Sequence, residues 1–181
     1  TFIMRMLIGD LLELVFINIL REVGANIEIP NSVSLVLSTG RKVNGTPDII
    51  IDGEVFDIKS CSNWAFNNKW LDFDTLKKDD PFGYVGQLAG YSKAGGWPAG
   101  GWWVINKESG QIRCVTAEGL DVDAELEKVA RNVQEHEKGV FKRQFEPVKE
   151  TYRKKESGNL KLCSTCDWCE YRKDCWPTLR E

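Results

Sequence analysis

The chain has 181 residues, of which 42% are hydrophobic and 28% are charged, and its formal net charge is −3. This length suits one domain with a small appendage. The composition excludes an intrinsically disordered chain, which would be poorer in hydrophobic residues and more highly charged. The negative balance argues against nucleic acid as a partner unless the basic residues are concentrated on one surface.

The first part of the chain is predicted to form a helix followed by short strands. A mostly apolar run predicts a helix over residues 2–23, and charged residues such as Asp10 interrupt the uncharged stretch that a membrane span needs. Short strands are expected over 25–29 and 33–38. We recognise no signal peptide and no membrane segment, so we expect a cytoplasmic protein whose clustered cysteines stay reduced.

The rest of the chain is predicted to alternate hairpins and helices. A two-residue Asp52-Gly53 turn indicates a tight hairpin, and Pro81 suits the first turn of a helix. In chain order we expect a hairpin over 47–60, an irregular loop over 62–80, a helix over 80–93, a second hairpin formed by 101–106 and 111–116, and an amphipathic helix over 121–140.

The first hairpin brings charged side chains together. Counting outward from the turn places Asp48 directly opposite Asp57, and the period of two along a strand puts Lys59 on the same face. Two carboxylates this close either share a proton or bind a hard divalent cation. The lysine beside them could orient water or stabilise charge at phosphorus. The alternative is a solvent-facing hairpin with ordinary surface electrostatics.

The same residues resemble a known nuclease signature. Gly45-Thr-Pro-Asp48 followed by Asp57-Ile-Lys59 is similar to the motif of the PD-(D/E)XK nuclease superfamily, including the literal Pro-Asp pair. The resemblance implies that Asp48 and Asp57 hold Mg²⁺ or Mn²⁺, with the backbone carbonyl of Ile58 as a further ligand. It also implies that Lys59 positions or activates the attacking water.

Two further motifs resemble the RecB-like branch of that superfamily. Gln87-Leu-Ala-Gly-Tyr91 occupies the expected helix, and a spacing of four puts both side chains on one face. The resemblance implies that Gln87 and Tyr91 support the site and contact DNA. Gly9-Asp-Leu-Leu-Glu13 resembles the first motif, in which many relatives carry a metal-binding histidine. Glu13 falls inside the apolar arc of its helix, where a carboxylate is costly unless it is paired or metal-bound; the alternative is a glutamate that reaches solvent from the edge of that arc.

The cysteines indicate a separate centre. Six cysteines stand against one histidine, and four of them form the cluster Cys163, Cys166, Cys169 and Cys175. Four thiolates satisfy either tetrahedral Zn²⁺ or an iron–sulfur cluster, and spacing does not choose between them. The segment resembles the C-terminal cysteine motif of RecB-like nucleases that hold a [4Fe-4S] cluster, including CRISPR adaptation exonucleases. Zinc and a disulfide-stapled tail remain alternatives, and Cys61 is the alternative to Cys163 as fourth ligand.

Two other features bear on a nucleic-acid path. Residues 138–161 hold eight Lys or Arg against three Glu; this basic segment could meet phosphates, or it is a solvated helix face or linker. Four aromatic residues in the predicted loop could stack on unpaired bases, or they are packing anchors. They are Trp64, Phe66, Trp70 and Phe73.

Together these resemblances imply an α/β (α+β) fold with a PD-(D/E)XK, restriction-endonuclease-like core and a mixed, largely antiparallel sheet flanked by helices. We expect a RecB-like nuclease core over 1–140 and a basic connector with a cysteine-bound lobe, packed on the core, over 141–181. The implied function is metal-dependent hydrolysis of DNA, as an exonuclease of phage or CRISPR-linked type, in a bacterial, archaeal or phage-infected cell. Recombination or CRISPR-adaptation proteins are the implied partners. A catalytically silent DNA-binding module, a structure-specific endonuclease and an RNA substrate are the alternatives.

Overall fold

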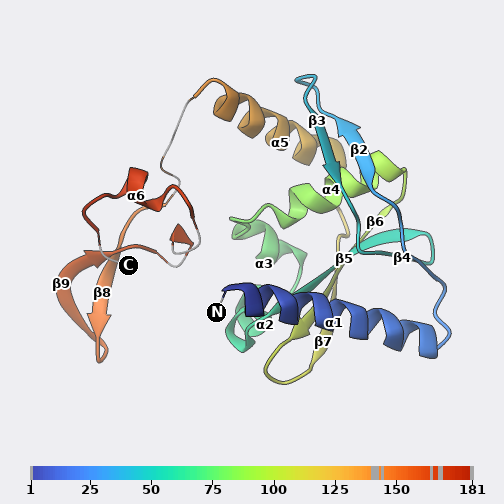
Figure 1. The fold of residues 1–181 in the computed structure, drawn as a ribbon, viewed down its shortest axis with the longest axis horizontal. Helices are drawn as coiled ribbons and strands as arrows, with labels where there is room; N and C mark the ends of the chain where they lie inside the picture. The colour runs from blue at the N-terminus through green and yellow to red at the C-terminus, as the bar shows by residue number, and fades with distance from the viewer. Residues whose placement is uncertain (1, 140–142, 144, 164, 167–168, 180–181) are drawn as a thin grey trace. The chain divides into compact units, whose positions relative to one another are not determined.

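A computed structural model describes residues 2–139, 143, 145–163, 165–166 and 169–179 (Figure 1). The chain divides into two compact units, 1–134 and 135–181. Their boundary falls inside the helix α5 (Val122–Glu137), whereas residues 140–142, at the expected division, lie outside the described residues. None of the helices in the described part of the chain combines the length and the apolar run that a membrane span requires.

The first unit is built on a mixed five-stranded sheet in the order β1-β4-β5-β6-β7. Only the central pair β5 and β6 is parallel, and the other neighbours are antiparallel, which confirms the expected α/β class with a largely antiparallel sheet. A separate two-stranded sheet pairs β2 with β3. The strands are β1 (Ile27–Glu28), β2 (Val33–Val36), β3 (Lys42–Gly45), β4 (Ile49–Ile51), β5 (Glu54–Cys61), β6 (Ala99–Asn106) and β7 (Ile112–Thr116).

Helices cover the two faces of this sheet. On one face, Phe16 of α1 (Phe2–Glu22) packs in a cluster with Phe56 and Ile58 of β5. On the other, Leu88 of α4 (Tyr84–Gly95) lies in a cluster with Val55 of β5 and other buried sheet residues. Because side chains alternate along a strand, Asp57 and Lys59 emerge on the α4 face. The pattern of core residues on β5 therefore decides where its charged residues point.

The helix α1 is apolar around most of its circumference, but only part of that surface meets the sheet. Phe16 and Ile17 are buried, whereas much of the remaining apolar surface is exposed to solvent. The exposed apolar side chains are Met4, Met6, Leu7, Ile8, Leu11, Leu14, Val15 and Ile19. A helix that is hydrophobic all round is usually buried on all sides, so α1 leaves an apolar surface larger than the sheet alone requires.

The segment 62–80 is not the irregular loop that we expected, because two short helices form within it. Ser62 caps α2 (Asn63–Asn68), and Asp72 caps α3 (Phe73–Lys78), each through a side-chain oxygen that accepts a backbone N–H. The helix expected over 80–93 begins only at Tyr84, because the Asp80 carboxylate accepts the backbone N–H groups that open it.

The aromatic residues of that segment mostly serve as packing anchors. Phe66 and Trp70 are buried, and the Phe73 ring stacks on Trp102 of β6 with ring centroids 5.8 Å apart. Trp64 is different, since it is 67% exposed. Of the two alternatives that the sequence left open, the packing anchor therefore describes Phe66, Trp70 and Phe73.

The second unit contains an antiparallel hairpin of β8 (Val148–Tyr152) and β9 (Lys155–Lys161), followed by the short helix α6 (Arg172–Cys175). Most of the basic segment 138–161 is thus a hairpin, and neither a helix face nor a linker; its Lys142 lies outside the described residues. The residues of β9 are all exposed, so their charges face solvent. The expectation that 141–181 packs on the core stays a prediction.

We expect Gly101→Ala to destabilise the first unit. Gly101 has a φ of 143°, next to an irregularity in the register of β5 and β6, and a Cβ there would overlap the Val115 carbonyl oxygen of β7. Both effects strain the sheet that carries the site. The melting temperature, measured by calorimetry, should fall by roughly 5–10 °C, given ~2–4 °C per kcal/mol for a chain of this size.

Gly90→Ala is the matched control. Gly90 lies inside α4, where no described atom stands within 4 Å of an added Cβ. Alanine should stabilise this helix by about 0.5–1 kcal/mol. Equal melting temperatures for the two variants would contradict the role assigned to Gly101.

Candidate functional site

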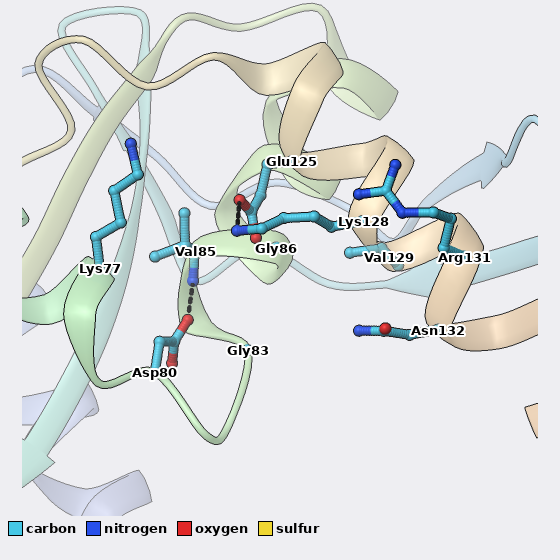
Figure 2. Close-up of a pocket in the computed structure, with 10 residues that line it drawn as sticks. All are labelled: Lys77, Asp80, Gly83, Val85, Gly86, Glu125, Lys128, Val129, Arg131 and Asn132. Carbon is cyan, nitrogen blue, oxygen red and sulfur yellow. Dashed lines mark hydrogen bonds and ion pairs between the residues drawn. The ribbon is translucent and has the colours of Figure 1, made fainter. Parts of the chain in front are cut away.

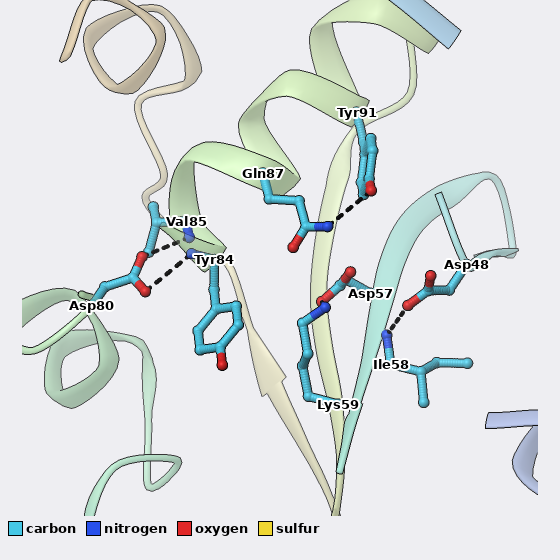
Figure 3. A network of polar contacts seen from close by, with 9 residues as sticks. All are labelled: Asp48, Asp57, Ile58, Lys59, Asp80, Tyr84, Val85, Gln87 and Tyr91. Carbon is cyan, nitrogen blue, oxygen red and sulfur yellow. Dashed lines mark hydrogen bonds and ion pairs between the residues drawn. The ribbon is translucent and has the colours of Figure 1, made fainter. Parts of the chain in front are cut away.

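The candidate site lies at a step in the sheet, where β4 ends and β5 continues (Figure 3). The pairing of β4 with β5 stops at Ile49 and Phe56, in the register expected from the hairpin turn, whose two residues both have positive φ. Asp48 lies directly before the first residue of β4, and its Oδ2 accepts a hydrogen bond from the Ile58 backbone N–H at 2.6 Å. The N–H and C=O of one strand residue point to the same side, so the Ile58 carbonyl also faces the side on which Asp48 lies.

Asp57 is buried at the centre of this step. Its side chain is 1% exposed, and Oδ2 lies 2.6 Å from the Lys59 ammonium. The other oxygen, Oδ1, is buried without a hydrogen-bond partner among the described residues. A buried carboxylate oxygen without a donor is costly, and a proton or a cation at Oδ1 would relieve that cost.

The electrostatics of the pair place a proton equilibrium close to neutral pH. Burial raises the pKa of Asp57 to about 7; the Lys59 ammonium opposes this rise and the neighbouring Asp48 carboxylate adds to it. Burial, the largest single influence, acts to lower the pKa of Lys59, but the charge and hydrogen bond of Asp57, together with smaller contributions from Asp48 and Tyr84, raise this pKa overall. Lys59 therefore stays protonated at neutral pH, whereas the Asp57 carboxyl group titrates near neutral pH.

Glu13 of α1 is influenced by the charges of the same site. It is half-buried, and burial raises its pKa, with further rises from the charges of Asp48 and Asp10 and a partial offset from Lys59. The charges of Asp48 and Lys59 thus act on Glu13, whose role as a metal ligand stays a prediction. Three carboxylates against one ammonium leave an excess of two negative charges when all are ionised, which matches the charge of one divalent cation.

Gln87 and Tyr91 lie above the buried pair on one face of α4 (Figure 3). Gln87 Nε2 donates a hydrogen bond to the Tyr91 hydroxyl at 2.9 Å, as the spacing of four allows. Tyr91 packs so closely on Gly45 that a Cβ there would come within 2.7 Å of the ring. Burial raises the pKa of Tyr91, so its hydroxyl remains a neutral donor at the edge of the site.

Tyr84 also lies at the site and was not among the residues predicted from the sequence. The Lys59 ammonium lies 5.4 Å from the centroid of the Tyr84 ring, at the start of α4. Burial raises the pKa of this tyrosine, and the Lys59 charge opposes the rise. The signal that could have found it is the spacing of Tyr84, Gln87 and Tyr91, since residues i, i+3 and i+7 share one helical face.

The clustered cysteines lie in the second unit. Cys163 Sγ donates to Cys166 Sγ at 3.5 Å, close to the ~3.8 Å that a tetrahedral zinc with 2.3 Å bonds would impose on two thiolates. Burial first, and then the neighbouring thiols, including Cys169 and Cys175, raise the pKa of Cys166 to about 11. For Cys163, burial acts upward but hydrogen bonds from Cys166 and Thr165 prevail, and the pKa is lowered.

The remaining cysteines belong to the first unit. Cys61 is buried and Cys114 is partly buried, and burial raises the pKa of both thiols. They are small apolar core residues, as expected. Cys61 belongs to a different compact unit from the cysteine cluster.

The donor types suit the predicted metals, although the ligands are not gathered around one point. Within the described ranges, no group of three or more His, Cys, Asp or Glu side chains stands close enough to hold a metal ion. Carboxylate and carbonyl oxygens such as those of Asp57 and Ile58 are donor types that suit Mg²⁺ or Mn²⁺, and the buried Asp57 Oδ1 has no hydrogen-bond donor among the described residues. The four thiols suit zinc or an iron–sulfur cluster.

A pocket of about 300 Å³ lies apart from these residues, between the start of α4 and α5 (Figure 2). Both carboxylates on its wall are already engaged. Asp80 accepts the backbone N–H groups of Tyr84 and Val85, and Glu125 pairs with Lys128 at 2.7 Å. The pocket therefore adds no free acidic ligand to the candidate site.

Comparisons with known proteins do not identify a family. No protein-family model matches the chain, and no curated protein is significantly similar to it in sequence. A crystal structure of a protein designated SSO0001 is similar, with a TM-score of 0.47 and 18% sequence identity. The likeness covers 76% of this chain and 61% of that one, so this chain spans less than two thirds of that protein. A likeness this distant carries no argument about function.

The stability of the protein should fall as pH rises through the range set by Asp57. The folded state holds this proton up to a pKa of about 7, against a usual value of 3.8, so it binds more protons than the unfolded state between these values. The contribution of this proton to stability is then greatest below about pH 4 and decreases towards pH 7 by a few kcal/mol, at ~1.4 kcal/mol per pKa unit. Asp57→Asn should remove most of this decrease in calorimetric scans at about pH 5 and about pH 8.

Asp123→Asn is the control, because this exposed carboxylate pairs only with the exposed Lys93 among the described residues. Mn²⁺ should raise the melting temperature of the wild type more at the higher pH, where Asp57 is ionised and free to bind it. The same pH dependence in the wild type and in Asp57→Asn would contradict the assignment of this proton to Asp57.

Proposed function

We propose that this protein is a divalent-metal-dependent deoxyribonuclease of the RecB-like PD-(D/E)XK type. The observation that supports it best is the convergence of Asp48, Asp57 and Lys59 at the step between β4 and β5, with one oxygen of a buried carboxylate left without a partner. A structural ion pair at a protein surface would not need to leave a buried oxygen unsatisfied. The assignment as an exonuclease rests on the sequence resemblance alone.

The acidic residues divide their oxygens between fixed contacts and metal binding. Asp57 Oδ2 is held by Lys59, which leaves Oδ1 for a cation. Asp48 Oδ2 is fixed by the Ile58 N–H, which orients the carboxylate without using both of its oxygens. Glu13 and the Ile58 carbonyl would complete an oxygen-rich set that suits Mg²⁺ or Mn²⁺ once an ion draws these ligands together. When bound, the ion would supply Lewis-acid stabilisation of the charge that develops on the scissile phosphate.

Lys59 serves this reaction as a cation. Its raised pKa keeps the ammonium protonated at neutral pH, so it is not the base that deprotonates water. It can donate hydrogen bonds to the attacking water and to a phosphate oxygen, and it holds Asp57 in place. Gln87 has an exposed side chain next to the buried pair, and its hydrogen bond to Tyr91 orients it towards an incoming DNA backbone.

The cysteine cluster has a separate, structural role in this proposal. Cys163, Cys166, Cys169 and Cys175 would hold a [4Fe-4S] cluster, with zinc as the alternative, and so fix a segment that has little core of its own. Only Leu162 and Cys166 of the described residues beyond Glu135 are buried hydrophobic residues. A metal centre would compensate for that small core.

Linear DNA cleavage should depend on Lys59. We expect Lys59→Ala to lower the rate with Mg²⁺ or Mn²⁺ by at least about a hundredfold, because the ammonium stabilises charge that appears only in the transition state. The rate is measured on end-labelled single-stranded and duplex oligodeoxynucleotides resolved by gel electrophoresis. The product sizes also separate exonuclease from endonuclease activity.

Lys93→Ala is the matched control, since it removes one positive charge from the last turn of α4 and breaks only an exposed ion pair with Asp123. It should cleave DNA like the wild type. Equal rates for the wild type and Lys59→Ala would exclude the mechanism, and an RNA or branched substrate cleaved in preference to linear DNA would correct the substrate.

The colour and the metal content of the purified protein identify the metal of the cysteine cluster. We expect an anaerobic preparation to be brown and to contain iron and sulfide, because four thiolates from one short segment suit a [4Fe-4S] cluster. Cys166→Ser should lose the colour, whereas Cys114→Ser, which changes a thiol of the other unit, should keep it. A colourless preparation that contains zinc would show that the alternative holds, and one without either metal would contradict both.

A further inference from the structure

A small, partly exposed surface next to the candidate site has no role in the function proposed so far. It consists of Lys69, Phe82 and Tyr84, and we call it the aromatic ledge. Phe82 is 55% exposed, and its ring centroid lies 5.8 Å from that of Tyr84. The Lys69 ammonium lies 5.4 Å from the centroid of Phe82 and 5.2 Å from that of Tyr84. The ledge thus combines an accessible aromatic face with a cation.

The aromatic ledge adjoins the candidate catalytic residues. Tyr84 is shared between two lysines, because Lys59 and Lys69 both place their ammonium groups within 5.4 Å of the centroid of its ring. Lys59 in turn contacts the buried Asp57 carboxylate. If one monomer of a polymer binds at Lys59, the adjacent monomer can therefore contact Lys69 and Phe82.

The ledge is held in place by its surroundings. The Asp80 carboxylate accepts the backbone N–H groups of Tyr84 and Val85 at 3.0 and 2.9 Å, which fixes the turn that carries Phe82 (Figure 3). The buried Trp70 ring supports Tyr84 from within, at 5.2 Å between centroids. Trp70 follows Lys69 in the chain, and its backbone carbonyl accepts a hydrogen bond from Arg113 of β7 at 2.8 Å. Such a surface needs little rearrangement to bind a ligand.

Lys69 has no ion-pair partner in the part of the chain that the structure describes. Burial lowers its pKa, and the charges of Asp79 and Asp80 only partly offset this effect. Neither aspartate forms an ion pair with Lys69 in the described part of the chain, where the contacts of its ammonium are with aromatic rings. A half-buried cation of this kind is stabilised by an anion that approaches from solvent.

We propose that the aromatic ledge is a subsite for an unpaired nucleotide next to the scissile phosphate, in which the base stacks on Phe82 and Lys69 contacts a phosphate. The inference rests on the proposed nuclease function for its substrate. An exposed aromatic face beside a cation is the combination that binds single-stranded nucleic acid without reading its sequence. A base in a continuous duplex is already stacked on both sides, so the ledge acts on single strands and frayed ends.

The test is a binding measurement that needs no cleavage. Fluorescence anisotropy in EDTA compares a labelled oligodeoxythymidine of about twelve nucleotides with an abasic strand of equal length, which keeps the phosphates but has nothing to stack. We expect the wild type to bind the thymidine strand about tenfold more tightly. Phe82→Ala should lose that preference and bind the abasic strand like the wild type.

Three further variants sharpen the result. Phe82→Trp should restore the preference, Phe82→Leu should not, and Lys69→Met should weaken binding of both strands. Trp64→Ala removes another exposed aromatic side chain, on α2, and should bind like the wild type. An unchanged preference in Phe82→Ala, an equal loss for both strands, or an equal loss in Trp64→Ala would overturn the proposal.

Cleavage assays on the same proteins separate this inference from the function on which it rests. If the wild type cleaves DNA but Phe82→Ala binds the strands like the wild type, the nuclease function holds and the subsite is excluded. Strand binding that depends on Phe82 in a protein without nuclease activity would do the reverse. A blunt duplex should bind equally to the wild type and to Phe82→Ala.

Discussion

The buried contact between Asp57 and Lys59 is the constraint on which the rest of the site depends. A sheet interior favours apolar side chains, and a carboxylate that is 1% exposed is retained there only with a partner. The position of Asp57 follows from β5, which pairs with β4 on its antiparallel side and with β6 on its parallel side. Because β4 begins only at Ile49, no strand in the described part of the chain pairs with this edge of β5 beyond Phe56. The Asp48 side chain takes the place of a strand there and accepts the Ile58 backbone N–H. The same short β4 that exposes the edge therefore also brings the second acid to the site.

The parts of the site that depend on local chemistry could be predicted from the sequence. The two-residue turn fixes the register of the hairpin, so the positions of Asp48, Asp57 and Lys59 follow by counting. Counting from this turn does not reach Tyr84. Its spacing from Gln87 and Tyr91 could have placed it on the same helical face, but its contact with Lys59 joins two elements and is seen only in the structure. The hairpin of the second unit was missed for a local reason: its turn residues, Arg153 and Lys154, have positive φ without the Gly or Asn that usually marks such turns. The two helices within 62–80 begin at N-caps, Ser62 and Asp72, that could have been recognised in the sequence.

The two proposed metal centres ask different things of the chain. Oxygen donors for a hard cation come from residues far apart in sequence and depend on the sheet to be assembled, as the contact from Asp48 to Ile58 illustrates. Thiolates for a soft metal come from one short segment and need little tertiary structure. Damage to the sheet should therefore affect the carboxylate site before the cysteine cluster. Loss of the cluster would act first on the second unit, where few described residues are buried.

The apolar outer surface of α1 changes how the folded state will look to common probes. Monomeric proteins seldom expose a contiguous apolar patch of more than a few hundred Å², and α1 presents eight exposed apolar side chains along one helix. Dyes that fluoresce on apolar surfaces are usually taken to report partial unfolding. On this protein they would bind the native helix and give a bright signal before any heating, so a high starting fluorescence would be a property of the fold and not a sign of its loss.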